Sequence, residues 1–185
     1  MSTLVQTVDA LHGGKVVAYP TEGLFGLGCD PDKPAAIEQL LTIKQRSREK
    51  GLILIAASFE QLAPYVDLST IEGERQEQIF ASWPGPVTWV LPASEYTSQW
   101  VTGKFDTVAV RVSDHPQVVE LCLAFGKPLI STSANLSGHP AAVDVDQVES
   151  QMGTYLAAIL SGETGGRNKP SMIIDGRSGN ILREG

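Results

Sequence analysis

Four polar segments carry residue types that could bind an anionic substrate. Lys44-Gln-Arg46 presents an ammonium and a guanidinium group close together, and both groups suit a phosphate or a carboxylate. Ser131-Thr-Ser-Ala-Asn-Leu-Ser137 supplies hydroxyl groups and an amide directly after an apolar run. Arg111 lies in a segment of alternating pattern, and Pro20-Thr-Glu22 stands in a glycine-rich setting. If these segments meet in one cleft, they predict a site for an anionic ligand.

Each segment also has a structural explanation that requires no ligand. The C-terminus of a helix favours cations, which alone explains Lys44 and Arg46. Serine, threonine and asparagine commonly form turns, an arginine on a strand usually faces solvent, and glycines are typical of a structural turn. The functional interpretation therefore depends on convergence. We expect four side chains to line a common hollow: Lys44, Arg46, Arg111 and Asn135.

Several familiar sites are excluded by their missing motifs. The sequence has no G-x-x-x-x-G-K-[ST] and no G-x-S-x-G. Gly26-Leu-Gly28 begins a dinucleotide fingerprint, but Pro31 stands where the third glycine should be. The histidines lie at no metal-ligand spacing: His12, His115 and His139. We therefore expect no Walker-type site, no hydrolase triad and no metal site built by the protein.

Length and composition predict one domain that spans residues 1–185. A chain of 185 residues with 42% hydrophobic residues can bury a core without disulfide bonds. The longest apolar run, Leu52–Ala57, is far shorter than the span of about 20 residues that a membrane helix needs. No cationic segment precedes an apolar stretch near Met1, and Cys29 and Cys122 stand far apart. We expect a cytoplasmic protein with no membrane contact.

The charge of the chain is acidic overall but uneven. Lys and Arg total 14 and Asp and Glu total 21, so the net charge of −7 has the wrong sign for coating nucleic acid non-specifically. Positive charge gathers locally at Lys44, Arg46, Arg48 and Lys50. Any anion site must therefore be local.

Alternating helices and strands must position these segments. The spacing of apolar residues and of capping residues predicts helices at 3–12 and 34–45, after Ser58, from Ser69 and Glu72 to Ala81, from Asp114 and Pro116 to Gly126, and from Val145 to Met152. Ser58 with Gln61 and Ser69 with Glu72 have the spacing of capping boxes. Short β-branched or apolar runs predict strands at 15–19, 52–57, 87–91, 107–112 and 129–132.

The remaining segments predict loops and a short-stranded tail. We expect loops at 20–29 and 133–140, a turn at 83–86, and three short apolar pieces in the tail from Ala157 to Gly185. Within 107–112, the alternation places Ala109 and Arg111 on the face that Ser113 continues. The pattern as a whole predicts an α/β fold with a mixed or largely parallel open sheet.

Five ordered segments resemble one known family. They are Pro20-Thr-Glu-Gly-Leu-Phe-Gly-Leu-Gly28, Lys44-Gln-Arg46, Trp83-Pro-Gly-Pro-Val-Thr88, Ala109-Val-Arg-Val112 and Ser131-Thr-Ser-Ala-Asn135. Together they are similar to the YrdC/Sua5/TsaC family, in its short bacterial form without the Sua5 C-terminal domain. The resemblance implies a single-domain twisted open sheet flanked by helices, the YrdC-like or RibB-like fold, with a concave ligand-binding face.

The resemblance also implies an activity and its site. Family members are threonylcarbamoyl-AMP synthases, nucleotidyltransferases that convert L-threonine, bicarbonate and ATP into L-threonylcarbamoyladenylate and pyrophosphate. The family motifs place Lys44 and Arg46 at the reacting groups. Residues expected at ATP are Lys44, Arg48, Thr107, Asn135 and Arg183. Residues expected at threonine or its carbamate are Thr21, Arg46, Arg111, Ser133 and Ser171. Mg²⁺ would accompany ATP, held by phosphate oxygens and water.

The implied product serves threonylcarbamoyladenosine modification of tRNA beside the anticodon, so tRNA and the tRNA threonylcarbamoyl-transferase complex are expected partners. Two other functions stay open. A concave basic surface could bind tRNA or double-stranded RNA without catalysis. A carbamoyl-transfer domain like that of hydrogenase maturation would share the carbamoyl-adenylate step but accept carbamoyl phosphate.

Overall fold

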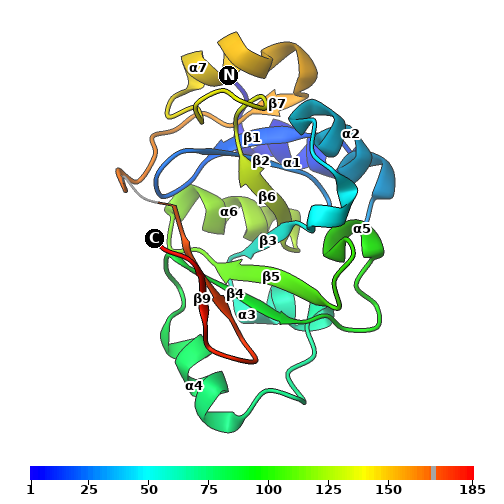
Figure 1. The fold of residues 1–185 in the computed structure, drawn as a ribbon. Coiled ribbons are helices and arrows are strands. Elements are labelled where there is room, and N and C mark those ends of the chain that lie inside the picture. The colour runs from blue at the N-terminus through cyan, green and yellow to red at the C-terminus, as the bar shows by residue number, and fades with distance from the viewer. Residues whose placement is uncertain (168–169) are drawn as a thin grey trace.

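A nine-stranded sheet forms the centre of the computed structural model, which describes residues 1–167 and 170–185 (Figure 1). The strands are β1 (Val17–Pro20), β2 (Phe25–Gly28), β3 (Ile53–Ala56), β4 (Val87–Pro92), β5 (Thr107–Val112), β6 (Leu129–Ser133), β7 (Ala158–Ile159), β8 (Met172–Asp175) and β9 (Ile181–Arg183). They lie in the order β7-β1-β2-β6-β3-β5-β4-β8-β9. The pairs β1–β7, β3–β5 and β4–β8 are parallel, and the other neighbouring pairs are antiparallel. The predicted mixed sheet is confirmed.

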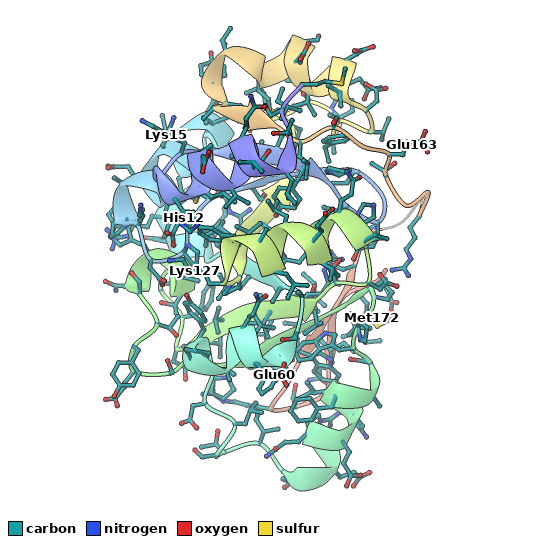
Figure 2. All side chains as sticks on the ribbon, turned by 180° about the vertical axis from the view of Figure 1, so that it is seen from behind. His12, Lys15, Glu60, Lys127, Glu163 and Met172 are labelled. Carbon is teal, nitrogen blue, oxygen red and sulfur yellow. The ribbon has the colours of Figure 1, made fainter. Side chains whose placement is uncertain are left out.

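Helices flank this sheet. They are α1 (Leu4–His12), α2 (Pro34–Lys44), α3 (Phe59–Leu62), α4 (Gly73–Ala81), α5 (Gln99–Thr102), α6 (Pro116–Phe125) and α7 (Val145–Met152), with short 3-10 turns η1 (Arg48–Lys50), η2 (Ala63–Tyr65) and η3 (Gly153–Tyr155). Figure 2 shows from behind that α1 and α6 lie side by side across the sheet. Leu11 of α1 and Leu121 of α6 are fully buried in one cluster with Val17 and Ile55 of the strands.

The two helices that flank the site residues begin and end where the sequence predicts. Pro34 opens α2 and Pro116 opens α6, as expected because proline lacks the N–H that the first helical turn leaves unpaired. Gln45 ends α2 in the left-handed region with φ 48°, and Gly126 ends α6 with φ 85°. The end of α2 therefore directs Lys44 and Arg46 toward different surroundings.

The loop predicted at 20–29 is wrong in its second half, where β2 pairs with β1 and with β6. Glycine is required here by close packing. A Cβ atom on Gly28 would lie 2.6 Å from the carbonyl oxygen of Ile130 and 2.7 Å from the ring of Tyr19. Glycine therefore lets the buried Tyr19 ring and the neighbouring strand approach β2 closely.

Both predicted capping boxes are wrong. Ser58 precedes α3, but its side chain makes no capping bond among the described residues, and Gln61 Oε1 accepts from the N–H of Ala57 at 3.0 Å instead. Ser69 does not start a helix, because α4 begins at Gly73 and Glu72 is its N-cap residue. Capping-box spacing alone does not fix the backbone, which must also turn into a helix at that residue.

Other boundaries differ from prediction near the C-terminal half. His115 rather than Asp114 is the N-cap residue of α6, and its side chain makes no capping bond among the described residues. The Asp114 carboxylate instead accepts from Arg167 Nη2 at 2.7 Å. Helix α5, which was not predicted, is capped by Ser98. The three tail pieces form β7, β8 and β9, which extend the sheet at both edges. In the described ranges, no helix is both long and apolar enough to cross a membrane.

Candidate active site

A cleft of about 1000 Å³ opens beside β5. Thr107, Ala109 and Arg111 of this strand line it, whereas Val108, Val110 and Val112 are buried on the opposite side. The alternation predicted for this strand is confirmed. The remaining wall comes from α5, from β2, β3, β4, β6, β8 and β9, and from loop segments that include those around Thr21, Arg46, Ala141 and Arg167. Segments from the whole length of the chain therefore meet at this cleft.

The structure brings seven of the ten predicted site residues to this cleft: Thr21, Arg46, Thr107, Arg111, Ser133, Ser171 and Arg183. The other three, Lys44, Arg48 and Asn135, are not among the described residues that line it. The common hollow expected for Lys44, Arg46, Arg111 and Asn135 thus contains the two arginines. Lys44 and Asn135 lie behind it.

Lys44 and Asn135 form a polar cluster that supports the wall at Ser133. Lys44 is 8% exposed, and its Nζ donates to the carbonyl oxygens of Ser133 and Asn135 at 2.7 and 2.8 Å and to Asn135 Oδ1 at 2.6 Å. Ser133 Oγ also donates to Asn135 Oδ1 at 2.7 Å. Burial, and secondarily the nearby Arg46 charge, lowers the pKa of Lys44 to about 8. Lys44 is therefore mainly protonated at pH 7, and its three N–H groups match three acceptors.

Arg48 lies outside the cleft wall on the exposed turn η1. Its guanidinium carbon is 3.7 Å from the centre of the Trp100 ring, which gives a cation–π contact. The basic cluster predicted from Lys44 to Lys50 is thus divided among different surroundings. Lys44 is buried, Arg46 and Lys50 line the cleft, and Arg48 stacks on Trp100.

Arg46 enters the cleft from the segment after α2. Its Nη2 donates to the carbonyl oxygen of Gly51 at 3.0 Å, which fixes one side of the guanidinium. Its Nε is buried and has no hydrogen-bond partner among the described residues. Burial lowers the pKa of Arg46. A buried N–H without an acceptor is costly, and an anionic ligand would satisfy it.

Arg111 is held by an acidic partner that the sequence interpretation did not assign to the site. Its Nη2 lies 3.1 Å from Glu22 Oε2, and both side chains are nearly buried, at 11% and 7% exposed. Glu22 Oε1 accepts from Ser113 Oγ at 2.6 Å. The Nε of Arg111 is buried without a partner in the described part of the chain. Glu22 was visible as part of the Pro20–Gly28 segment, but only the fold shows its contact with Arg111.

The C-terminal hairpin completes the wall with Arg183. Its Nε and Nη2 donate to the carbonyl oxygen of Ser171 at 3.1 and 2.7 Å, and Nη2 also donates to Ser171 Oγ at 3.1 Å. Ser171 Oγ lies 3.0 Å from Thr88 Oγ1 of β4. Burial, together with the charge of Arg111, lowers the pKa of Arg183. Thr88 lies in the Trp83–Thr88 segment, but its place on the wall was not predicted.

The wall of the cleft is positive although the chain is acidic. Five cations line its described part, namely Arg46, Lys50, Arg111, Arg167 and Arg183, against the two acids Glu22 and Asp175. The sequence analysis did not assign Arg167 to the site. Main-chain hydrogen bonds to residues distant in sequence bring its segment to the cleft. Gly165 N donates to the oxygen of Thr21 at 3.0 Å, and Arg167 N donates to the oxygen of Glu22 at 2.9 Å. This wall suits a ligand with several negative charges.

Sequence comparison relates the chain to known proteins. The profile of the Sua5/YciO/YrdC family, described as "Telomere recombination", matches residues 9–185. The chain is 58% identical to the threonylcarbamoyl-AMP synthase of Vibrio campbellii over 185 residues, which cover 100% of both proteins. It is 60% identical to the threonylcarbamoyl-AMP synthase of Vibrio cholerae, across 100% of this chain and 98% of that protein.

Structural comparison leads to the same group of proteins. The structure of P. abyssi Sua5 complexed with L-threonine is similar with a TM-score of 0.86 and 32% sequence identity. The match covers 93% of this chain and 50% of that chain, so this chain spans about half the length of that Sua5 protein.

Proposed function

The chain belongs to the Sua5/YciO/YrdC family, and from this premise we propose that it is a threonylcarbamoyl-AMP synthase. It converts L-threonine, bicarbonate and ATP into L-threonylcarbamoyladenylate and pyrophosphate, and is therefore a nucleotidyltransferase. The family resemblance predicted from the sequence is confirmed.

One observation carries this function. Arg46 and Arg111 are distant in sequence, yet both line one cleft, and each has a buried Nε–H without an acceptor among the described residues. Fixed guanidinium groups of this kind bind carboxylates and phosphates through paired N–H donors. A reaction that joins an amino acid to a nucleotide requires both kinds of anion in one site.

The chemistry has two bond-forming steps. The threonine amine first attacks the carbon of bicarbonate, and water leaves, so that a carbamate forms. A carbamate oxygen then attacks the α-phosphorus of ATP, and the bond to the leaving pyrophosphate breaks. Charge develops on the transferring phosphoryl group and on the leaving phosphates. Positioned cationic donors stabilise that charge, and each well-placed donor contributes about 2.7 to 4 kcal/mol.

We assign each of three arginines to one part of the substrates, and each is fixed by a different acceptor of the protein. Arg111, held on β5 by Glu22, binds the threonine carboxylate with its remaining N–H groups. Arg46, anchored to the oxygen of Gly51, neutralises the carbamate and the reacting phosphate. Arg183 binds the polyphosphate from the C-terminal hairpin. Because all three are fixed by protein acceptors, little side-chain freedom is lost when the substrates bind.

Hydroxyl groups complete the substrate contacts. Thr21 Oγ1 donates to the oxygen of Leu24 at 2.7 Å, so its lone pairs remain available to accept from the threonine amine or hydroxyl. Ser133, Ser171 and Thr107 also line the cleft, and in this proposal Ser133 and Ser171 contact threonine or its carbamate while Thr107 contacts ATP. Lys44 and Asn135 were expected at ATP, but in this proposal they support the wall segment at Ser133. Arg48 reaches the nucleotide only if it leaves Trp100.

Mg²⁺ would enter with ATP. No group of three or more His, Cys, Asp or Glu side chains in residues 1–167 and 170–185 could hold a metal ion. The wall acids are already engaged, since Glu22 contacts Arg111 and Asp175 Oδ1 accepts from the N–H of Ser178 at 2.8 Å. In this proposal phosphate oxygens and water would hold the ion, as is common for Mg²⁺.

The product and the buried thiols suggest where the enzyme acts. L-threonylcarbamoyladenylate passes to the tRNA threonylcarbamoyl-transferase complex, which modifies tRNA beside the anticodon. Cys29 and Cys122 are both buried and free, as suits a reducing compartment such as the cytoplasm.

RNA binding without catalysis has weaker support. The sequence feature that favoured RNA binding is the basic run from Lys44 to Lys50. This run does not form one exposed surface, because Lys44 is buried and Arg46 lies in the cleft. The net charge of −7 also opposes attraction of a polyanion from a distance. We therefore favour the catalytic function.

The direct test is product formation from labelled bicarbonate. The protein is incubated with ATP, Mg²⁺, threonine and ¹³C-bicarbonate, and the adenylate and pyrophosphate are measured by mass spectrometry and a coupled assay. We expect a labelled product that requires all three substrates. Arg46→Gln should lower kcat about 10²- to 10³-fold, because it removes a charged donor at the reacting groups.

The control for Arg46→Gln is Arg177→Gln, which removes an exposed arginine paired with Asp106 at 2.8 Å. It should leave the rate unchanged. A product that forms from carbamoyl phosphate and needs no threonine would replace this function with carbamoyl transfer. Salt-sensitive RNA binding with no adenylate formed would favour the RNA-binding module instead.

A further inference from the structure

Glu22 is a buried carboxylate on the wall of a cleft that is otherwise positive. It follows β1, lines the cleft, and is only 5% exposed. An ionised carboxylate in such a place must be paired, because burial of an unpaired charge is strongly unfavourable. The question is therefore which groups it holds.

Glu22 Oε1 makes a hydrogen bond, whereas Oε2 is buried and makes an ion pair but no hydrogen bond among the described residues. Oε1 accepts from Ser113 Oγ at 2.6 Å, and Oε2 lies 3.1 Å from Arg111 Nη2. Ser113 is itself fixed, since its Oγ accepts from the N–H of His115 at 3.1 Å. The chain of contacts thus runs from the start of α6 through Ser113 and Glu22 to Arg111.

This arrangement differs from that of a general base. A general base needs a lone pair that faces the proton it removes. In Glu22, Oε1 accepts from a hydroxyl donor, and Oε2 is buried 3.1 Å from the Arg111 guanidinium group, so neither oxygen is open to a substrate proton. Its contacts therefore favour a role in fixing Arg111.

Arg111 needs such a partner because other cations are near. Arg46 and Arg183 line the same cleft, and the charge of Arg111 contributes to the lowered pKa of Arg183. Glu22 is the one acidic side chain paired with Arg111 among the described residues. Without it, repulsion and rotamer freedom would allow the guanidinium to move away from the wall.

We propose that Glu22 is a positioning residue that holds the guanidinium of Arg111 in the orientation that binds the threonine carboxylate. The identity of the ligand rests on the proposed function, whereas the control of Arg111 by Glu22 does not. Glu22 acts through Arg111 and touches no reacting atom.

The first test is kinetic and uses Glu22→Gln, which keeps an acceptor for Ser113 and removes the charge. We expect the KM for threonine to rise about 10- to 100-fold, because the charged hydrogen bond between Arg111 and the threonine carboxylate is lost. The KM for ATP and the kcat at saturating threonine should change by less than about threefold, because the remaining cations keep their own supports. A general loss of fold would instead lower the amount of active enzyme, and with it the apparent kcat, without a selective rise in the KM for threonine.

Matched variants separate the positioning role from a general effect of charge. Asp106→Asn removes the carboxylate from an exposed arginine pair, Arg177–Asp106, and should leave the KM for threonine unchanged. In an Arg111→Ala background, Glu22→Gln should have no further effect on that KM. An equal rise of KM in both backgrounds would overturn the proposal. If Glu22→Gln does not fold, Ser113→Ala carries the test, since it removes the other anchor of the carboxylate and should give a smaller rise.

A second measurement does not depend on the reaction. The Nε–H of Arg111 is followed by NMR and assigned from its loss in Arg111→Lys. In the wild type this buried group should exchange slowly, and Glu22→Gln should accelerate the exchange by about tenfold or more as the guanidinium is released. Unchanged exchange would overturn the proposal even in an active enzyme. Faster exchange in a protein that makes no adenylate would instead remove the proposed function and leave the role of Glu22 intact.

Discussion

The ammonium group of Lys44 binds acceptors within the protein and does not line the cleft. All three of its N–H groups have acceptors in the segment from Ser133 to Asn135. That segment carries Ser133 to the wall of the cleft. Lys44 therefore links the end of α2 to the end of β6, and its substitution should affect stability as well as catalysis.

We expect Lys44→Met to lower the free energy of unfolding by about 1 to 3 kcal/mol, because it leaves buried oxygen acceptors without a donor. Urea unfolding at pH 7 measures this difference. The matched control is Lys104→Met, which makes the same change at an exposed residue and should be nearly neutral. A variant as stable as the wild type would mean that the three contacts stabilise little.

The pH dependence of the same pair gives a separate prediction. The pKa of Lys44 is lowered from 10.5 in a free side chain to about 8 in the fold, mainly by burial. Between these pH values the unfolded chain holds more protons on Lys44 than the folded chain does, so this group makes stability rise with pH. The stability difference between wild type and Lys44→Met should therefore widen from about pH 8 to pH 10.5. If the difference narrows over this range, the three acceptors stabilise the ammonium more than burial opposes it.

Strand β2 requires glycine because its neighbours lie too close for a side chain. Its glycines let the Tyr19 ring and the carbonyl of Ile130 approach the strand, and a Cβ on Gly28 would lie within 2.7 Å of both. The strand pairs with β6, which continues into the site at Ser133. A displacement of β2 would thus reach the cleft wall.

Gly28→Ala should lower the free energy of unfolding by about 1 to 3 kcal/mol, the usual cost of overpacking a core. Gly73→Ala is the matched control, because a Cβ there meets nothing within 4 Å. It should be neutral or slightly stabilising, since it restricts the unfolded chain. Chemical denaturation of both variants measures the two free energies of unfolding. Equal effects of the two changes would show that loss of glycine flexibility, rather than contact with Tyr19, governs β2.

These elements show what the sequence can and cannot predict. The bounds of α2 and α6 follow from local signals: proline at each start, the end of the apolar spacing for α2, and Gly126 for α6. The strand at Phe25–Gly28 was missed because its glycines are explained only by Tyr19 and Ile130, which are distant in the chain or across the sheet.

The same distinction holds in the site. The face of β5 that carries Arg111 could be predicted, because alternation along a strand is a local property of the sequence. The direction of Lys44 toward Ser133, of Arg48 toward Trp100 and of Glu22 toward Arg111 was not. Those contacts join residues whose proximity is created by the order of strands in the sheet.

For the molecule as a whole, the net charge is negative, whereas the wall of the cleft is positive. The chain carries a net charge of −7, but the described part of the cleft wall has five cations and two acids. At an ionic strength of 0.1 M the screening length is about 10 Å. Carboxylates on distant surfaces are therefore largely screened from a ligand in the cleft, and the nearby arginines and Lys50 should dominate.

This conclusion can be tested with two substitutions that change the net charge equally. Lys50→Gln removes a cation from the cleft wall, and Lys15→Gln removes an exposed one that lies near α1 at the back of the molecule (Figure 2). We expect Lys50→Gln to raise the KM for ATP about two- to fivefold, which corresponds to an exposed ion pair worth up to about 1 kcal/mol. Lys15→Gln should leave this KM unchanged. Steady-state kinetics at low salt and near 1 M salt, where the screening length falls to about 3 Å, should show the Lys50 effect disappearing. An equal rise of KM in both variants would mean that the net charge of the chain, rather than the placement of cations around the cleft, controls the capture of ATP.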